Sequence, residues 1–241
     1  MKRTERKHLR ENEVQNFVRV ARHMFETRRG ESNLIIGLVV VVVLAAAGYY
    51  GWHEHVQSRA TSLLAEATIV QDARIGPPPA PGTPANGLYF PTERERAQAA
   101  LTKFKIAADA YPSADAGIYA RYLLAATYMT LGQAPQAATA YQQVIDFAGT
   151  RFYGQMARLG LAEAQARAGQ YDQAITAFKD LSLRKDGPLP VDGILMQLGR
   201  VYLDAGKKTE AQQTFNRVVE EFPESPFSGD ARKELDNLKK T

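Results

Sequence analysis

The longest uninterrupted run of apolar residues in the chain lies near its N-terminus, from Leu34 to Trp52. It holds nineteen residues, is rich in valine and carries no charge. As a helix it would be roughly 28 Å long, close to the hydrocarbon thickness of a bilayer. A buried strand is the alternative, but such strands rarely exceed about 8 residues. Aromatic rings favour the headgroup layer, and Tyr49, Tyr50 and Trp52 end the run, so the pattern predicts one transmembrane helix over residues 34–52.

After residue 92 the hydrophobic pattern repeats with a period of 37 residues. Each unit has an alanine, an aromatic residue four positions later and, in the last three units, a glycine five positions before the alanine. The alanines are Ala100, Ala137, Ala174 and Ala211, the aromatic residues are Phe104, Tyr141, Phe178 and Phe215, and the glycines are Gly132, Gly169 and Gly206. A fixed period in this range is typical of a solenoid of helix pairs, because one pair cannot bury its apolar face alone. We expect the first helix of each unit to end at the glycine and the aromatic residue to fill the space between pairs.

The remaining segments complete an all-α fold, with a transmembrane helix, a solenoid and a C-terminal capping helix. Residues 53–75 continue the membrane helix and form the first helix of a degenerate repeat. Residues 76–91 are a proline-rich linker through which we expect no helix or sheet to run. A capping box at Thr92 and Glu95 opens the repeats, which occupy residues 92–224. A polar capping helix follows over residues 225–241, with Ser225 as its N-cap and Pro226 at its first helical position.

The formal net charge of +4 belongs to the N-terminal tail, residues 1–33. This tail holds nine Lys and Arg and five Glu, whereas the residues after it are balanced at 21 basic and 21 acidic. The distribution argues against a nucleic-acid partner. By the positive-inside rule it keeps the tail cytoplasmic and places residues 53–241 on the far side, which in a bacterium is the periplasm. A cleaved signal peptide is the alternative, but both the charged lead and the apolar run are longer than such a signal requires.

Within the tail, Val14, Phe17, Val18 and Phe25 recur at helical spacing among arginines. They predict a basic amphipathic helix that lies on anionic lipid headgroups or docks on a membrane partner. A solvated tail that only sets the topology is the alternative.

The sequence offers no catalytic or metal-binding set. It has no cysteine, and its four histidines, His8, His23, His53 and His55, all precede the repeats. The two histidines that flank Glu54 suggest a metal site, but residues two apart on a helix do not face the same side. We therefore expect no enzyme activity, no cofactor, no metal and no small-molecule substrate.

The repeated positions resemble the tetratricopeptide repeat (TPR). The last unit matches best, with Leu198-Gly199, Tyr202, Gly206, Ala211, Phe215 and Pro223. Its period is three residues longer than the usual 34, which is similar to a subgroup found in bacterial envelope proteins. Tyr111-Pro112-Ser113 fits the turns of that subgroup.

The layout as a whole resembles one membrane-anchored family. It combines Glu11-Asn12-Glu13-Val14 and Phe17 in the tail, an anchor ending in Gly51-Trp52, and C-terminal repeats. This is similar to the ancillary SecYEG translocon subunit family, which shares its repeat domain with the cell-division coordinator of the Tol–Pal system. The resemblance implies a single-pass inner-membrane adaptor whose repeats link the Sec translocon to periplasmic folding factors.

By the geometry of the repeat, the first helix of each unit should line a partner-binding groove. Carried over position by position, the groove residues are Tyr119, Tyr122, Ala126, Met129, Met156, Leu159, Glu163, Arg167, Met196, Arg200 and Leu203. Tyrosine and methionine suit adaptable protein contacts. The Lys and Asn residues of a carboxylate clamp are replaced by Tyr122, Ala126, Gly160, Gly193 and Gln197, which argues against a cytosolic chaperone co-factor.

Two further hypotheses keep the binding role and change its setting. One is an envelope-assembly or cell-division scaffold. The other is a receptor whose repeats face the cytosol, as in organelle import.

Overall fold

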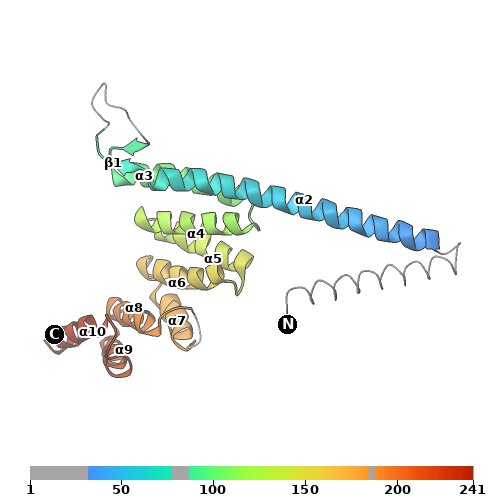
Figure 1. Ribbon diagram of the computed structural model, residues 1–241. Coiled ribbons are helices and arrows are strands. Elements are labelled where there is room, and N and C mark those ends of the chain that lie inside the picture. Colours follow the sequence, from blue (N-terminus) through green and yellow to red (C-terminus); the bar gives the residue numbers. More distant parts are fainter. Residues whose placement is uncertain (1–31, 78–86, 185–187, 241) are drawn as a thin grey trace, which may run out of the picture. The chain divides into compact units, whose positions relative to one another are not determined.

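The computed structural model describes residues 32–77, 87–184 and 188–240, and within these ranges the chain is all-α apart from one pair of short strands (Figure 1). Two compact units are formed by residues 1–55 and 56–241. The described elements are α2 (Ser32–Gln71), β1 (Arg74–Ile75), β2 (Tyr89–Phe90), α3 (Glu93–Ala110), α4 (Asp115–Thr130), α5 (Ala134–Ala148), α6 (Phe152–Arg167), α7 (Tyr171–Ser182), α8 (Val191–Asp204), α9 (Lys208–Glu221) and α10 (Ser228–Lys239). The expected fold class, an apolar helix followed by packed helix pairs, is confirmed. The amphipathic helix expected in the tail lies outside the described residues.

Helix α2 contains the whole apolar run and continues to Gln71. Large apolar side chains cover it over residues 38–52, and Leu38 and Trp52 are each about two-thirds exposed. Among the described helices it alone has the length and composition to cross a membrane. Its last turns are different, because Ala60, Ala67 and Val70 are buried, and Ala67 and Val70 share a core with residues of α3.

A small parallel sheet closes the proline-rich segment at its base. Arg74 pairs with Tyr89 and Ile75 with Phe90, and the N–H of Gly76 donates to the carbonyl of Phe90 at 3.0 Å. The expectation that no sheet enters residues 76–91 was therefore wrong. Proline removes a donor only at its own position, and Tyr89 and Phe90 keep theirs.

The expected helix boundaries follow from local chemistry. Thr92 caps α3, because its Oγ1 accepts from the N–H of Glu95 at 3.2 Å. Gly132, Gly169 and Gly206, which end the first helices, have φ of 73°, 76° and 74°, a left-handed conformation that favours glycine. The N-cap and the glycine ends of the first helices were predicted correctly, whereas the carboxylate of Glu95 accepts from the Thr92 hydroxyl at 3.2 Å rather than returning a bond to the backbone.

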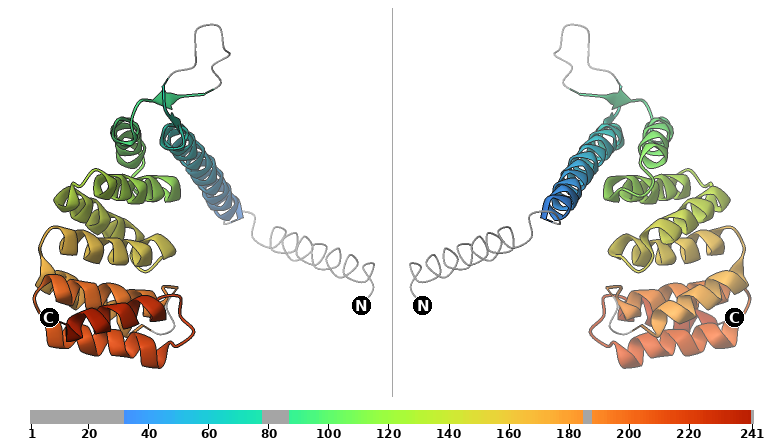
Figure 2. Two further views of the ribbon diagram at one scale, coloured as in Figure 1. Left: turned by 90° about the vertical axis from the view of Figure 1, so that its left-hand side faces the viewer. Right: turned by 90° about the vertical axis from the view of Figure 1, so that its right-hand side faces the viewer.

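The repeat cores are built from the residues that recur every 37 positions. The four alanines are at most 1% exposed, and Phe104, Phe178 and Phe215 are completely buried. The views in Figure 2 show the helix pairs from α4 to α9 stacked one on the next. Small alanines let paired helices approach closely, and each aromatic ring then fills the space at the contact.

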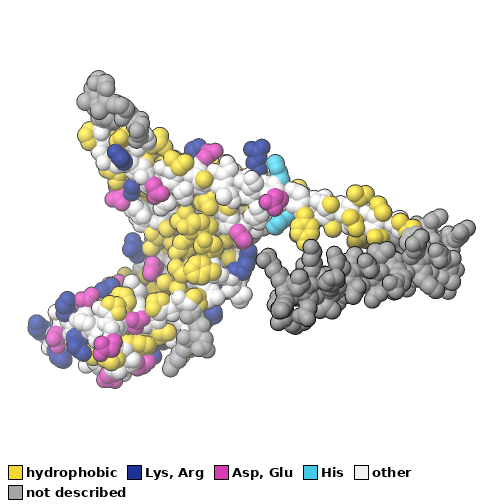
Figure 3. Space-filling model, in the orientation of Figure 1, with side chains coloured by type: hydrophobic (Ala, Val, Ile, Leu, Met, Phe, Trp, Pro, Cys, Tyr) yellow, Lys and Arg dark blue, Asp and Glu magenta, His cyan; other side chains and the backbone are white. Residues whose placement is uncertain are grey.

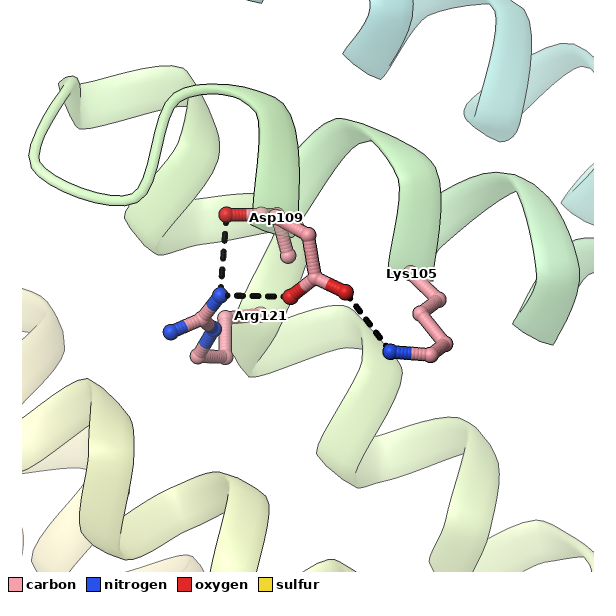
Figure 4. Close-up of polar contacts among 4 residues, drawn as sticks. Lys105, Asp109 and Arg121 are labelled. Carbon is pink, nitrogen blue, oxygen red and sulfur yellow. Dashed lines mark hydrogen bonds and ion pairs between the residues drawn. The ribbon is translucent and has the colours of Figure 1, made fainter.

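Arg121 fixes the junction between α3 and α4 (Figure 4). Its buried guanidinium donates to the carbonyl of Ala108 and to Oδ1 of Asp109, both at 2.9 Å. Lys105 donates to the other oxygen of Asp109. The guanidinium also lies 5.1 Å from the ring centre of Phe147 on α5. One side chain thus joins three successive helices.

The C-terminal capping helix begins later than predicted. α10 starts at Ser228, so Ser225 is not its N-cap. Ser225 instead stabilises the preceding turn, because its Oγ donates to Asp192 at 2.6 Å and accepts from the N–H of Phe227 at 3.0 Å. Pro226 accordingly lies in a turn rather than in the helix.

Candidate partner-binding face

Hydrophobic side chains gather over α4 and α6 on the face shown in Figure 3. These two helices are the first helices of successive units, and they contact each other directly. Tyr119, Tyr122 and Met129 of α4 and Met156 and Leu159 of α6 are all partly exposed. We call these five residues, together with Tyr153 of α6, the α4–α6 face.

Tyrosine rings form the centre of the α4–α6 face. The rings of Tyr119 and Tyr153 stack with centres 4.8 Å apart, and Tyr122 lies 6.2 Å from Tyr153. Tyr122 also meets the ring of Tyr141 edge-on at 5.6 Å. Such pairs hold each other in place and add about 0.5–1.5 kcal/mol beyond the area that they bury. The face is therefore preformed rather than a set of separate mobile side chains.

Tyr141 of α5 supports this cluster from below. It is 5% exposed, and burial raises the pKa of its hydroxyl, which stays neutral at physiological pH. Its ring packs on Gly160 of α6, where an added Cβ would come within 2.5 Å of the ring. Glycine is thus required at position 160 by close approach.

Glu163 places a carboxylate at the same face. Burial raises the pKa of Glu163, and the positive charge of Arg167 partly opposes that effect. Burial and, to a smaller extent, the negative charge of Glu163 raise the pKa of Tyr122. The α4–α6 face therefore combines aromatic rings with one acidic group, an arrangement suited to recognising a side chain that is both long and polar at its tip.

The structure brings together eight of the eleven predicted groove residues on α4 and α6. They are Tyr119, Tyr122, Ala126, Met129, Met156, Leu159, Glu163 and Arg167, all half-buried except Arg167, which is exposed. The other three lie on α8. Of these, Arg200 is exposed and Leu203 is half-buried.

Met196 was assigned to the groove, and this was wrong. It is 1% exposed and belongs to the C-terminal hydrophobic core. Phe227, in the turn before α10, and Leu235 of α10 pack against the same core. The capping segment, Phe227 together with α10, thus covers the surface of α8 that was expected to be part of the groove.

The sequence reasoning missed Tyr153 and treated Tyr141 only as core. Tyr153 precedes Met156 by three residues on α6, which places both on the same side of a helix. That spacing was a usable signal. The role of Tyr141 could not be read in this way, because its contact with Tyr122 depends on how α5 packs under α4.

Among the described residues, no group of three or more His, Cys, Asp or Glu side chains is placed to hold a metal ion. His53 and His55 are both exposed on α2.

Comparisons with known proteins agree with this architecture. The sequence model of the tetratricopeptide repeat-like domain matches residues 30–240, which include the apolar run as well as the repeats. No curated protein matches the chain. Among solved structures, a kinesin light chain candidate of Podosopora anserina with nearly identical TPR-like repeats is similar, with a TM-score of 0.57 at 17% identity over 76% of this chain and 86% of that one. A tetratricopeptide repeat protein of Parabacteroides merdae has a TM-score of 0.49 at 14% identity over 61% of this chain and 55% of that one.

Proposed function

The chain belongs to the tetratricopeptide repeat-like domain family, and from this premise we propose that it is a membrane-anchored adaptor whose α4–α6 face binds another protein. The observation that carries the proposal is the cluster of Tyr119, Tyr122 and Tyr153, which are partly exposed, pack on one another and rest on the buried Tyr141. Aromatic residues are enriched at the centres of protein interfaces, because a large rigid ring buries much area at a small cost in conformational entropy.

The apolar part of α2 supports the membrane anchor. Many of its side chains between Leu38 and Trp52 are more than half exposed. This run contains no charged residue. Exposing so much contiguous apolar surface to water is unfavourable. A bilayer removes this cost, and the tyrosines and tryptophan at the end of the run suit its headgroup layer.

The charge distribution supports a bacterial inner-membrane topology with the tail in the cytoplasm and the repeats in the periplasm. On this topology the proposed partners are subunits of the Sec translocon and periplasmic folding factors. The absence of clamp residues on the first helices, where Tyr122 and Ala126 stand instead, fits a partner other than a cytosolic chaperone tail.

The test is site-specific photo-crosslinking from the full-length chain in intact cells. A crosslinker at Tyr122 or Leu159 should capture channel subunits or periplasmic chaperones. One at Met196, which is buried, and one at Lys233, which is exposed on α10, serve as controls and should capture neither. Equal capture from all four positions, or capture of cytosolic proteins alone, would contradict the proposal. Capture of division-site proteins would instead favour the envelope scaffold.

Topology is tested separately by protease protection. In cells with a permeabilised outer membrane, residues 53–241 should become accessible to added protease while the tail stays protected. Protection of the repeats until the inner membrane is lysed would favour the cytosol-facing receptor.

A further inference from the structure

The carboxylate of Glu163 is half-buried and has no hydrogen bond or ion pair with any residue that the structure describes. Two exposed acidic groups of the repeats, by contrast, form ion pairs: Asp115 with Arg151 at 2.8 Å and Asp172 with Lys207 at 2.7 Å. Arg167 lies one helical turn further along α6 and is exposed, but it forms no ion pair with Glu163.

The fold does not require an acid at this position. The residues 37 positions before and after Glu163 are Ala126 and Arg200, and their helices form equally well. A partly desolvated carboxylate that forms no hydrogen bond or ion pair is unfavourable in the free protein, and burial accordingly raises the pKa of Glu163, an effect that the charge of Arg167 offsets only in part. A positive group that binds directly to the carboxylate would recover this cost.

Glu163 lies three residues after Gly160 on α6, on the side of the helix against which the Tyr141 ring packs. Tyr141 meets the ring of Tyr122 edge-on at 5.6 Å, and the negative charge of Glu163 contributes to the raised pKa of both tyrosines. Ala126, one turn after Tyr122 on α4, adds no polar group that could pair with the acid. Ring faces attract cations, most strongly where water is partly excluded.

We propose that Glu163 and the ring of Tyr122, supported by Tyr141, form a subsite for one lysine or arginine side chain of the protein segment that binds the α4–α6 face. The proposal rests on the protein-binding function above and specifies the chemistry of the partner. The carboxylate supplies the charge-assisted hydrogen bond, and the ring covers the aliphatic part and the cationic edge of the bound side chain.

The test uses small probes, so that it does not depend on knowing the partner. The full-length chain in detergent micelles, with isotope-labelled tyrosine rings, is titrated with Nα-acetyl-arginine amide, Nα-acetyl-lysine amide and Nα-acetyl-glutamine amide. The two cationic probes should shift the Tyr122 ring signals saturably, and the glutamine probe should bind at least about tenfold more weakly.

Two variants give opposite expectations, which a folding defect could not produce. Glu163→Gln should weaken the arginine probe at least about tenfold, whereas Arg167→Gln should tighten it, because the chain's own competing cation is removed. Glu220→Gln, at an exposed position on α9, is the matched control and should leave binding unchanged.

Equal affinity for arginine and glutamine probes, an unchanged arginine affinity in Glu163→Gln, or no saturable shift of Tyr122 would each overturn the subsite. Crosslinking from Tyr122 and Leu159 separates this failure from a failure of the proposed function. If those positions still capture a partner while the cationic probes do not bind, only the cation subsite is wrong.

Discussion

The α4–α6 face and the surface of α8 derive from the same positions of the repeat, yet they differ in exposure. Tyr122, Leu159 and Met196 are separated by 37 residues each. The first two are half-buried, although Leu159 packs against the C-terminal core, whereas Met196 is 1% exposed within that core. The cause is the capping segment, because the Phe227 ring lies within 3.3 Å of the place where a Cβ on Gly193 would be.

The two regions also differ in how their cores are filled. The core around α8 and α9 is rich in large aliphatic and aromatic residues, including Leu195, Leu198 and Phe215. The core under the α4–α6 face is mostly alanine, with Tyr141 as its largest side chain. We therefore expect the C-terminal region to be the more stable one. In the middle region Tyr141 packs in the core, whereas Tyr119, Tyr122 and Tyr153 remain partly exposed for a partner.

The largest effect is expected from Phe215→Ala in the C-terminal core. The ring is completely buried, so its removal should lower the free energy of unfolding by about 3–5 kcal/mol. Phe152→Ala at the margin of the middle region, where the ring is 58% exposed, should change it by less than about 0.5 kcal/mol. Denaturant titration of the full-length chain in micelles measures both. A loss in Phe215→Ala as small as that in Phe152→Ala would show that the buried ring does not hold the C-terminal core together.

Gly160→Ala should have the next largest effect, because the new methyl group would collide with the Tyr141 ring. We expect a loss of about 1–3 kcal/mol and altered ring signals of Tyr122, which touches Tyr141. Gly229→Ala on α10 is the control. An added Cβ there meets no atom within 4 Å, so stability should hold or rise slightly. An unchanged Tyr122 signal in Gly160→Ala would mean that the α4–α6 face does not depend on the packing below it.

Arg121→Met tests the junction that leads into the middle region. The variant loses hydrogen bonds to Ala108 and Asp109 and the contact with the Phe147 ring, and we expect a loss of about 1–3 kcal/mol. Lys105→Gln removes only an exposed ion pair with the same Asp109 and should have little effect. If both variants behaved alike, the buried guanidinium would not be what holds α3, α4 and α5 together.

The smallest effect concerns pH. Because burial raises the pKa of Glu163, the folded state holds its proton more tightly than the unfolded state. The stability contributed by this group is therefore present at low pH and lost as pH rises from the ordinary glutamate pKa through the raised value. Glu163→Gln should melt slightly above the native chain at neutral pH and together with it in acid. If Glu163→Gln instead melted below the native chain at neutral pH, the carboxylate would be stabilised by the fold.

Local patterns in the sequence were sufficient for most of the fold. Thr92 and Glu95 predicted the start of α3, and the three glycines predicted helix ends that have the left-handed φ. The errors lie where distant segments meet. The pairing of β1 with β2 joins residues on either side of the proline-rich segment, and the cover over Met196 comes from residues more than thirty positions further along the chain.

The sequence by itself determined the apolar helix, the repeat of period 37 and the residues that form its core, because these depend on hydrophobic periodicity and on glycine and proline chemistry near each position. Tertiary structure alone decided which part of the repeat surface stays open and which side chains stand beside Glu163. Tyr141 and Phe227 illustrate the reason. The Tyr141 ring packs on Gly160 of α6, and the Phe227 ring lies close to Gly193 of α8. Such contacts depend on how the helices stack and not on the pattern along any one helix.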